Sequence, residues 1–285
     1  MIHRLKVLPQ YLLPKQLFTS LAGRFASQAR GNTTTSVIRW FVKKYQVNMA
    51  EALNPDIASY ATFNDFFTRA LKPGARPLAA AELICPVDGA ISQFGDTKQD
   101  QIFQAKGHSY STTALVGGDS ALAAQFQNGS FATLYLSPKD YHRIHMPCDG
   151  TLTRMIYVPG DLFSVNPTTA RGVPGLFARN ERVVCVFETA QGPFVLVLVG
   201  ATIVGSMATV WHGQINPPRS ADVREWRYDD ELVSLKQGEE MGRFMLGSTV
   251  VMLFPENHSK TMVFNPAWEA GGAVQLGQAM RQLQT

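Results

Sequence analysis

The stretch that decides the fold is MGRFMLGSTVVMLF, residues 241–254. A charged, turn-prone segment ends at Glu240, and residues 249–254 form an apolar, partly β-branched run that is typical of a buried strand. Gly247 and Ser248 lie at the entrance to that strand. Because glycine leaves the peptide bond before Ser248 sterically open, the Ser248 hydroxyl can reach the carbonyl carbon of Gly247. This geometry suggests a point where the chain could cleave itself.

Two common motifs and a plain turn compete with that interpretation. Gly242 and Gly247 have the spacing of a phosphate-binding loop, but Ser248 stands where that loop needs its lysine, so we reject it. The nucleophile elbow of hydrolases requires Gly-x-Ser-x-Gly, whereas Val250 stands at the second glycine position. A turn that enters a strand is the simplest meaning of Gly-Ser-Thr taken alone.

The chain of 285 residues is long enough for one large domain, or for a core domain with a smaller appendage. Its longest apolar run, residues 194–199, has the length of a core strand and not the roughly 18 residues of a membrane span, so we expect no span. Cys85, Cys148 and Cys185 show no paired metal spacing. We expect them to be small buried side chains in a reducing compartment.

Charge is distributed unevenly along the chain. Residues 1–50 contain eight Lys or Arg and no acid, which leaves 18 of the 26 basic residues against all 22 acidic residues in the rest. This asymmetry predicts that the N-terminal segment faces an anionic partner. Phe18, Leu21 and Phe25 recur at helical spacing. A second helix is predicted to start with Thr34 or Thr35 as its N-cap.

Apolar side chains beside cations suit helices that lie in the headgroup region of an anionic membrane. The alternative is a pair of ordinary surface helices that pack their apolar faces on the protein core, and this segment alone leaves both readings open. The basic residues interleave with Leu and Phe and form no continuous stripe, so no nucleic-acid partner is expected.

Thr62 and Asp65 have the spacing of a capping box, which predicts a short helix from Phe63 that buries Phe66 and Phe67. Proline and glycine within residues 73–77 then end the helical part. We therefore expect a helical, membrane-associating region over residues 1–75 and a β-rich catalytic domain over residues 76–285.

Strand patterns separated by Gly and Pro dominate the chain after residue 83. The predicted strands are residues 83–85, 131–136, 152–158, 183–187, 194–204, 207–211 and 249–254. The fold class is therefore predicted to be α+β, with a mostly antiparallel β domain behind a helical N-terminal region.

Three side chains outside the Gly-Ser stretch are candidates for chemistry. His142 and His145 would share a face of a helix, but a strand would turn them to opposite sides. No third ligand is in register with them, so no metal site is predicted, and general acid–base work competes with a purely structural role. Asp88, at an Asp-Gly turn, can orient an imidazole, although a hairpin turn is the commoner meaning of that dipeptide.

Together, four ordered motifs resemble a known family, the pyruvoyl-dependent phosphatidylserine decarboxylase proenzymes of the bacterial type. The motifs are FNDFFTR at residues 63–69, PVDG at 86–89, YHRIHMP at 141–147 and LGST at 246–249. The resemblance covers most of the chain and shows no departure at the catalytic positions.

The resemblance implies that Asp88, His145 and Ser248 form a triad for self-cleavage between Gly247 and Ser248. Ser248 would become a covalent pyruvoyl cofactor, which forms a Schiff base with phosphatidylserine and leads to phosphatidylethanolamine and CO2. His142 is implied to protonate the carbanion left by CO2.

The same resemblance implies that a long chain, 1–247, and a short chain, 248–285, stay together as a heterodimer. Together with the basic N-terminal segment, it implies a peripheral enzyme on the cytoplasmic face of the cell membrane. A homodimer of the processed unit is a further expectation.

Three alternatives stay open at this point. One is a serine hydrolase that uses the Asp88, His145 and Ser248 triad without self-cleavage. Another is a pyruvoyl decarboxylase of a soluble amino acid, against which the basic amphipathic segment argues. The third is a non-enzymatic β module of the lipoyl-carrier type, which would need a lysine on a hairpin tip that the sequence does not place convincingly.

Overall fold

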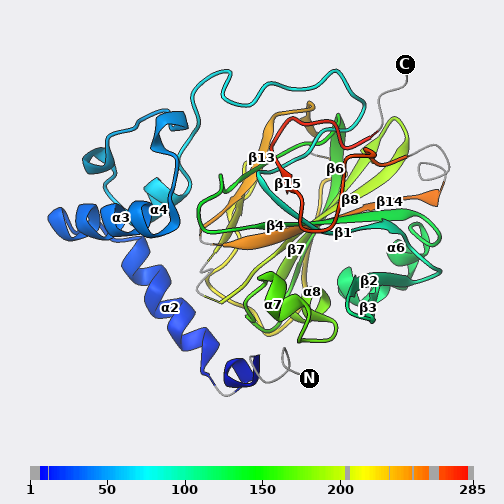
Figure 1. Cartoon of the computed structure of the whole chain (residues 1–285). Helices are drawn as coiled ribbons and strands as arrows, with labels where there is room; N and C mark the ends of the chain where they lie inside the picture. Colours follow the sequence, from blue (N-terminus) through cyan, green and yellow to red (C-terminus); the bar gives the residue numbers. More distant parts are fainter. Residues whose placement is uncertain are drawn as a thin grey trace.

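The computed structural model describes residues 7–11, 13–202, 206–230, 232–245, 247–256 and 263–281. Two antiparallel sheets form the body of the molecule, and a helical N-terminal region projects from one side of it (Figure 1). The predicted α+β class is confirmed. In the described ranges, no helix combines the length and apolar character needed to cross a bilayer.

The larger sheet has nine strands in the order β11-β6-β7-β8-β14-β4-β1-β15, with β12 also paired to β6. Its strands are β1 (Gly89–Asp96), β4 (Ser130–Leu136), β6 (Gly150–Val158), β7 (Arg182–Thr189), β8 (Gly192–Val199), β11 (Arg224–Arg227), β12 (Val233–Leu235), β14 (Ser248–Phe254) and β15 (Ala273–Val274).

A smaller four-stranded sheet lies against it, in the order β10-β9-β13-β5. Its strands are β5 (Arg143–His145), β9 (Met207–Thr209), β10 (Gly213–Gln214) and β13 (Glu240–Phe244), and a separate hairpin is formed by β2 (Gln101–Ala105) and β3 (His108–Ser111).

Strand β14, the predicted strand at residues 249–254, lies at the centre of the larger sheet. It pairs with β4 on one side and β8 on the other, and all seven of its residues are buried. Alternation along the strand sends Val250 and Met252 to one face and Val251 and Leu253 to the other. A strand covered on both faces needs a continuous apolar run, which is why this stretch carries no polar alternation after Thr249.

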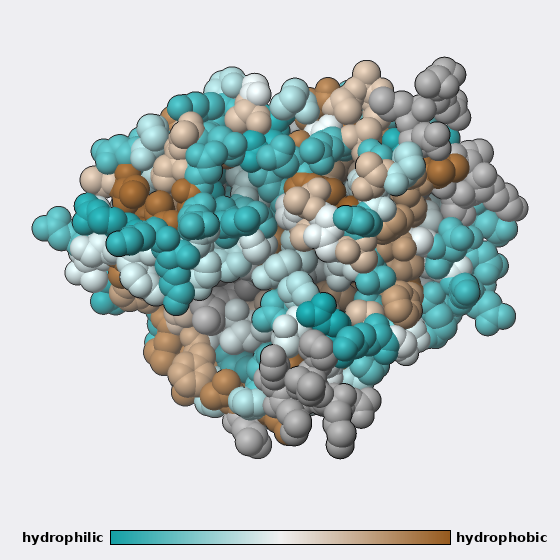
Figure 2. Space-filling view, viewed as in Figure 1, coloured by the Kyte–Doolittle hydropathy of each residue, from teal (hydrophilic) through white to brown (hydrophobic). Residues whose placement is uncertain are grey.

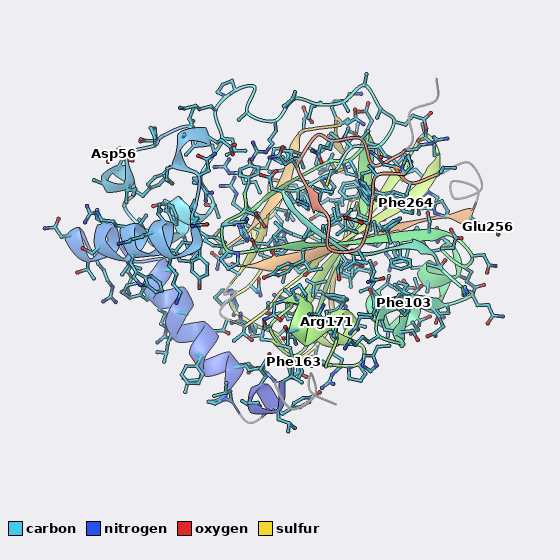
Figure 3. All side chains as sticks on the ribbon, in the orientation of Figure 1. Asp56, Phe103, Phe163, Arg171, Glu256 and Phe264 are labelled. Carbon is cyan, nitrogen blue, oxygen red and sulfur yellow. The ribbon has the colours of Figure 1, made fainter. Side chains whose placement is uncertain are left out.

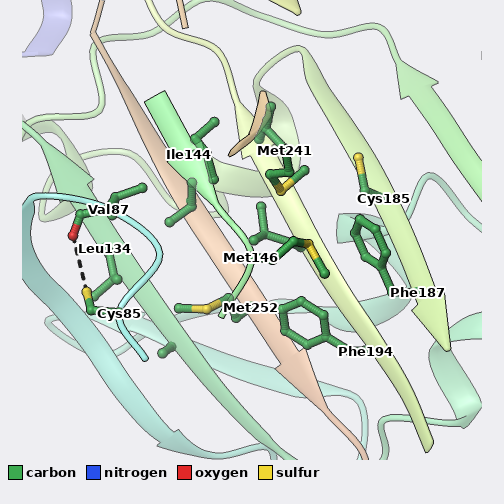
Figure 4. Packing of buried hydrophobic residues seen from close by; sticks show 14 of the residues in the cluster. Cys85, Val87, Leu134, Ile144, Met146, Cys185, Phe187, Phe194, Met241 and Met252 are labelled. Carbon is green, nitrogen blue, oxygen red and sulfur yellow. Dashed lines mark hydrogen bonds between the residues drawn. The ribbon is translucent and has the colours of Figure 1, made fainter. Parts of the chain in front are cut away.

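Each face of β14 contributes to a different core. Val250 and Met252 belong to the cluster between the two sheets, with Ile144 of β5 and Met241 of β13 (Figure 4). On the other face, Val251 packs in a cluster that is closed by the β2–β3 hairpin and the short helices α5 (Thr112–Leu115), α6 (Ser120–Ala124), α7 (Pro167–Ala170) and α8 (Leu176–Arg179). The three cysteines are buried and free, as predicted for their packing.

The N-terminal region has a small apolar core of its own. It contains α2 (Lys15–Ala26), α3 (Asn32–Tyr45), η1 (Met49–Glu51), η2 (Ile57–Ser59) and α4 (Phe63–Phe67). The predicted Thr62–Asp65 capping box is present in both directions, and the predicted burial of Phe66 and Phe67 is confirmed. With Phe63, they pack in one cluster with residues of α3. The predicted cap at Thr34 or Thr35 is wrong because α3 already begins at Asn32.

The Thr34 side chain has a different role from the predicted one. Its hydroxyl oxygen accepts a hydrogen bond from the backbone N–H of Arg30, at 3.1 Å. Thr34 therefore lies inside the first turn of α3, and its side chain bonds the backbone that precedes the helix. A pattern of apolar residues does not reveal such a contact.

The apolar side of α2 is largely exposed. Leu17, Phe18 and Leu21 have exposed fractions of 57%, 48% and 54%, and Trp40 of α3 has 55%. Tan and brown surface follows the lower-left edge of the molecule in Figure 2, where Figure 1 places α2. The alternative in which this face packs on the protein core is therefore wrong for these side chains.

The N-terminal end of α2 contacts the β-rich body through Phe163 (Figure 3). The Lys15 Nζ lies 3.7 Å from the centre of the Phe163 ring, and the Tyr11 ring packs edge-on against the same ring at 4.9 Å. Gln10 adds hydrogen bonds to Ser164 N and Thr169 Oγ1. Contacts of Lys15 and of the segment before it thus hold this end of α2 against the body.

Several predicted strands have different limits in the structure. Residues 83–85 form only a bridge, Ile84 to Ala279, because the backbone N–H groups of Ile84 and Cys85 donate to the loop carbonyls of Pro147 and Gln278. The strand predicted at 194–204 ends at Val199, and residues 203–204 lie outside the described ranges.

The strand predicted at 207–211 ends at Thr209, whose Oγ1 accepts from His212 N at 3.3 Å in the turn to β10. The Asp88–Gly89 pair enters β1 and makes no hairpin, so that alternative is wrong. Gly89 is required there because a Cβ would lie 2.3 Å from the Tyr135 carbonyl oxygen.

Candidate functional site

Ser248 is the first residue of β14 and is fully buried. Its Oγ has no hydrogen-bond partner in the described part of the chain. Alternation places it on the face of Val250, toward the smaller sheet. Gly247 has φ of +33°, in the left-handed region that glycine adopts without the steric cost of a Cβ. The Gly-Ser junction is thus a tight turn that delivers an unpaired hydroxyl into the protein interior.

His142 lies beside the segment that leads to this junction. Its carbonyl oxygen accepts from Phe244 N at 3.0 Å, and Phe244 ends β13 four residues before Ser248. The imidazole is fully buried against the Phe67 ring, with ring centres 4.1 Å apart. Its Nδ1 donates to the Asp140 carbonyl oxygen at 2.8 Å, and its Nε2 has no partner among the described residues.

The protonation of His142 follows from these contacts. A carbonyl oxygen only accepts hydrogen bonds, so Nδ1 carries the hydrogen and Nε2 presents a lone pair. Burial, together with the nearby positive charge of Arg69, lowers the pKa of His142 to about 3. The neutral imidazole is therefore a proton acceptor at Nε2, and it must take up a proton before it can donate one.

His145 is the last residue of β5, with Ile144 turned to the core, and His142 precedes the strand. The two histidines therefore do not lie on one face of a helix. The His145 Nδ1 donates to the Gly238 carbonyl oxygen at 2.8 Å, and its Nε2 lies 3.0 Å from the Tyr141 hydroxyl. Desolvation by burial lowers the pKa of His145, and burial raises the pKa of Tyr141 to about 12. The hydroxyl therefore donates to a neutral imidazole.

Asp88 lies immediately before β1 and is 6% exposed. Its carboxylate accepts from Arg76 Nε, at 2.9 and 3.1 Å, and from Arg76 Nη2, at 2.6 Å. A further hydrogen bond comes from Leu276 N at 2.9 Å. Arg76 also donates to Glu51 at 2.8 Å, and its hydrogen bond to Asp88 is the main cause that raises its own pKa. Asp88 is thus held by a bidentate ion pair.

The four predicted residues gather at one end of the larger sheet. Thr249 pairs with Tyr135, and Tyr135 pairs with Ala90, so the starts of β14 and β1 are level with β4 between them. The His145 N–H donates to the Pro86 carbonyl oxygen at 2.9 Å, two residues before Asp88. Figure 1 shows β14 beginning on the side where α3 and α4 lie.

The direct hydrogen bonds of the predicted triad are not formed. In the described structure, the hydrogen-bonding atoms of Asp88 and His145 are engaged by Arg76, Leu276, Gly238 and Tyr141, and Ser248 Oγ is unpaired. The structure therefore gathers the three residues in one region and leaves them unconnected.

A cavity of about 550 Å³ opens beside Asp88, and we refer to it as the Asp88 cavity. Its wall combines the turn after α3, the residues after α4 and the loop between β4 and β5. The side chains used below are Glu51, Arg69, Arg76, Asp88, Lys139, Asp140 and Tyr141. Separately, the described residues contain no cluster of three or more His, Cys, Asp or Glu side chains arranged to bind a metal ion.

Comparison with known proteins gives this site a context. A family model described as phosphatidylserine decarboxylase matches residues 63–282, and a second, described as PSD, matches residues 5–46. The chain is 76% identical over 280 residues to the phosphatidylserine decarboxylase proenzyme of Albidiferax ferrireducens, covering 98% of each chain.

Two further relatives carry the same name. The Polaromonas naphthalenivorans protein is 76% identical and covers 98% of this chain and 97% of its own, and the Dechloromonas aromatica protein is 73% identical and covers 98% of each. The chain belongs to the phosphatidylserine decarboxylase family. The resemblance inferred from four motifs is confirmed, and the relatives do not favour the hydrolase, soluble amino-acid or carrier alternatives.

Sequence reasoning missed several residues of the site in this family member. Arg76 lies in the Pro- and Gly-containing segment that reads as a linker, and its ion pair with Asp88 has no local signal. Tyr141 and Arg69 are inside the recognised motifs but had no role assigned to them. Phe67 was predicted to be buried, but its contact with His142 depends on how α4 packs on the β4–β5 loop.

Proposed function

We propose that this chain decarboxylates phosphatidylserine to phosphatidylethanolamine and CO2, after it cleaves itself between Gly247 and Ser248. The observation that carries the proposal is the buried, unpaired Ser248 hydroxyl next to a left-handed glycine, at the start of the central strand. A buried hydroxyl without a partner is costly to stability, which points to a reactive role.

In the cleavage step, the Ser248 oxygen attacks the Gly247 carbonyl carbon while a base takes its proton. We assign that base to His145, oriented by Asp88. For this assignment, the hydrogen bond from Tyr141 to His145 Nε2 must open, so that Nε2 can accept the Ser248 proton. The Nδ1–H must turn from the Gly238 carbonyl oxygen to Asp88, and Asp88 must turn from Arg76 toward it. The N→O shift gives an ester, and elimination then releases the Gly247 carboxylate and leaves dehydroalanine at position 248. Hydrolysis of that residue releases ammonia.

The short chain, 248–285, is expected to remain bound to the long chain, 1–247. Strand β14 pairs with β4 along its whole length and with β8 over five residues. The backbone N–H of Leu276 reaches Asp88, and β15 pairs with β1, so a second segment of the short chain is also bound. Cleavage at the edge of this arrangement leaves the pairing intact.

The residues at this end of β14 fit a pyruvoyl group at position 248, because Ser248 itself would supply its atoms in a site without a competing hydrogen bond. Such a group supplies the electron sink that decarboxylation of an amino acid headgroup needs. His142 is the proposed proton carrier, with Nδ1 fixed by Asp140 and Nε2 free to exchange a proton at the reacting carbon.

The N-terminal region, residues 1–75, is proposed to hold the enzyme on an anionic membrane as a peripheral protein at the cytoplasmic face. Exposed Leu17, Phe18 and Leu21 on α2, with Trp40 on α3, give an apolar contact for acyl chains. Arg24, Lys43 and Lys44 lie on the same two helices and supply charge for anionic headgroups. A homodimer of the processed unit remains part of the proposal.

Three variants test the assigned roles by mass spectrometry and a CO2-release assay. Ser248→Ala should stay uncut and inactive, and cleavage of this variant would refute Ser248 as the attacking group. His142→Ala should cleave and decarboxylate hardly at all. If His142→Ala stays uncut while His145→Ala cleaves, the roles of the two histidines are exchanged. Fluorophosphonate labelling of Ser248 in an intact, active chain would favour the hydrolase instead.

A further inference from the structure

Arg69 is a buried cation that forms no ion pair with any carboxylate in the described part of the chain. The residue is 5% exposed, and its side chain lines the Asp88 cavity and packs over the Phe66 ring. The Arg69 Nη2 makes a long hydrogen bond of 3.4 Å to the Lys139 carbonyl oxygen, and Nε has no partner in the described residues. A buried guanidinium stays charged, so leaving it incompletely satisfied is costly unless an anion binds.

The acidic groups around the cavity are already engaged. Asp88 and Glu51 bind Arg76, and Asp140 accepts from both the N–H and the hydroxyl of Ser137. These carboxylates attract Arg69 electrostatically from a distance, and none forms an ion pair with it in the described structure. Lys139 is exposed at the rim. Arg69 is therefore the buried cation of the cavity wall that has no ion pair among the described residues and can meet an incoming anion.

Arg69 is also close to the proposed proton carrier. Phe67, two residues earlier, lies against the His142 ring, and Arg69 itself contacts the loop that supplies Asp140 and His142. In the serine headgroup, one carbon and one oxygen separate the reacting carbon from phosphorus. A residue that holds the phosphate must therefore lie near the group that exchanges a proton with the reacting carbon.

We propose that Arg69 binds the phosphodiester of the phospholipid headgroup, in the Asp88 cavity. This inference rests on the proposed function for its choice of ligand. The headgroup carries two anions, a phosphodiester and a carboxylate. An arginine on the carboxylate would stabilise the ground state and oppose loss of CO2, whereas one on the phosphodiester holds substrate and transition state alike. Arginine matches two phosphate oxygens with its planar fork.

The test measures binding without the cofactor and without turnover. Calorimetry on the full-length Ser248→Ala chain uses sn-glycero-3-phosphoethanolamine, which has the phosphodiester and no carboxylate, and O-methyl-L-serine, which has the reverse. Adding Arg69→Met should weaken phosphodiester binding by about tenfold or more and leave O-methyl-L-serine binding unchanged. Arg69→Lys should weaken it less. The control is Arg154→Gln, which removes an arginine paired with Asp119 and Glu225.

Several outcomes would overturn the proposal. These are loss of O-methyl-L-serine binding alone, equal binding by all Arg69 variants, or no phosphodiester binding by the parent chain. Inorganic phosphate that binds as tightly as the phosphodiester would show a general anion site. If Arg69→Met does not fold, Arg69→Lys is used in its place, because it keeps a positive charge at this position. Phosphodiester binding as tight in Arg69→Lys as in the parent chain would then overturn the proposal.

A second arm uses the processed enzyme on phosphatidylserine vesicles. Arg69→Lys should raise KM by several-fold with a smaller change in kcat, because the lost contact is made in both ground and transition states. An unchanged KM would contradict the proposal. If the parent enzyme releases no CO2 but binds the phosphodiester through Arg69, the proposed function fails and the binding site stands.

Discussion

At the scale of single residues, the site contains buried polar atoms that have no hydrogen-bond partner in the described structure. Ser248 Oγ, His142 Nε2 and Arg69 Nε are all buried without a hydrogen-bond partner in the described structure. Each is costly to bury. The proposed function gives Ser248 the Gly247 carbonyl carbon and His142 a proton, and the proposed headgroup binding gives Arg69 a phosphodiester. The same logic separates the two histidines, since His145 already has both ring nitrogens engaged.

His142 should make stability depend on pH in a defined window. Its folded-state pKa of about 3 lies below the value of 6.5 expected when unfolded, so the unfolded chain binds more protons between these values. The stabilising contribution is present above pH 6.5 and is lost as the pH falls toward 3. In urea unfolding of the Ser248→Ala chain, lowering the pH from 6.5 to 5.0 should cost about 1 to 2 kcal/mol more than in the same chain with His142→Gln. Parallel losses in the two chains would show that His142 is not held neutral.

Arg76 should matter more than the sequence suggests. Arg76→Gln leaves Asp88 buried without its ion partner, a change that typically costs about 3 to 5 kcal/mol for a buried pair. We expect a lower urea midpoint. We also expect slower self-cleavage, because Asp88 loses the contact that holds it in place before it turns toward the imidazole. Glu51→Gln is the matched control, since the Glu51 side chain is 35% exposed and its loss should cost under about 1 kcal/mol. Cleavage at the wild-type rate in Arg76→Gln would show that Asp88 does not need this partner.

At the scale of elements, features that depend on neighbouring residues could be predicted from the sequence, whereas pairing between distant segments could not. The Thr62 capping box and the apolar run of β14 are each defined by a few neighbouring residues, and both are found in the structure. The short strands β5, β13 and β15 carry no periodic signal, because two to five residues are too few for one and their pairing comes from distant segments. The site follows the same division: residues in recognisable motifs were named, but the contacts of Asp88 with Arg76 and of His145 with Tyr141 were not.

Helix α2 should supply membrane affinity without supporting the fold. Replacing Leu17, Phe18 and Leu21 with Ser removes three exposed apolar side chains, each worth about 1.5 kcal/mol or more when buried in lipid. We expect binding to anionic vesicles to fall by about 100-fold or more, with self-cleavage unchanged. Vesicle sedimentation measures the loss. The control is Leu232→Ser, which changes a leucine that is 82% exposed outside this region. Equal binding by both variants would contradict the proposed docking.

At the scale of the whole molecule, the proposed cut would not divide the fold. The predicted cut lies at the edge of the central strand, and the short chain would keep its pairing with β4, β8 and β1. The two chains should therefore elute together in size-exclusion chromatography under native conditions and separate only in denaturant. Their separation in native buffer would contradict the proposed heterodimer.

The most direct test is intact-mass analysis of freshly synthesised full-length protein, followed over time. The account predicts that a single chain gives way to residues 1–247 and 248–285, with the shorter product lighter by one ammonia than a chain with a free N-terminal serine. A protein that stays uncut, or that ends in an unmodified serine at position 248, and still converts phosphatidylserine to phosphatidylethanolamine would contradict the account.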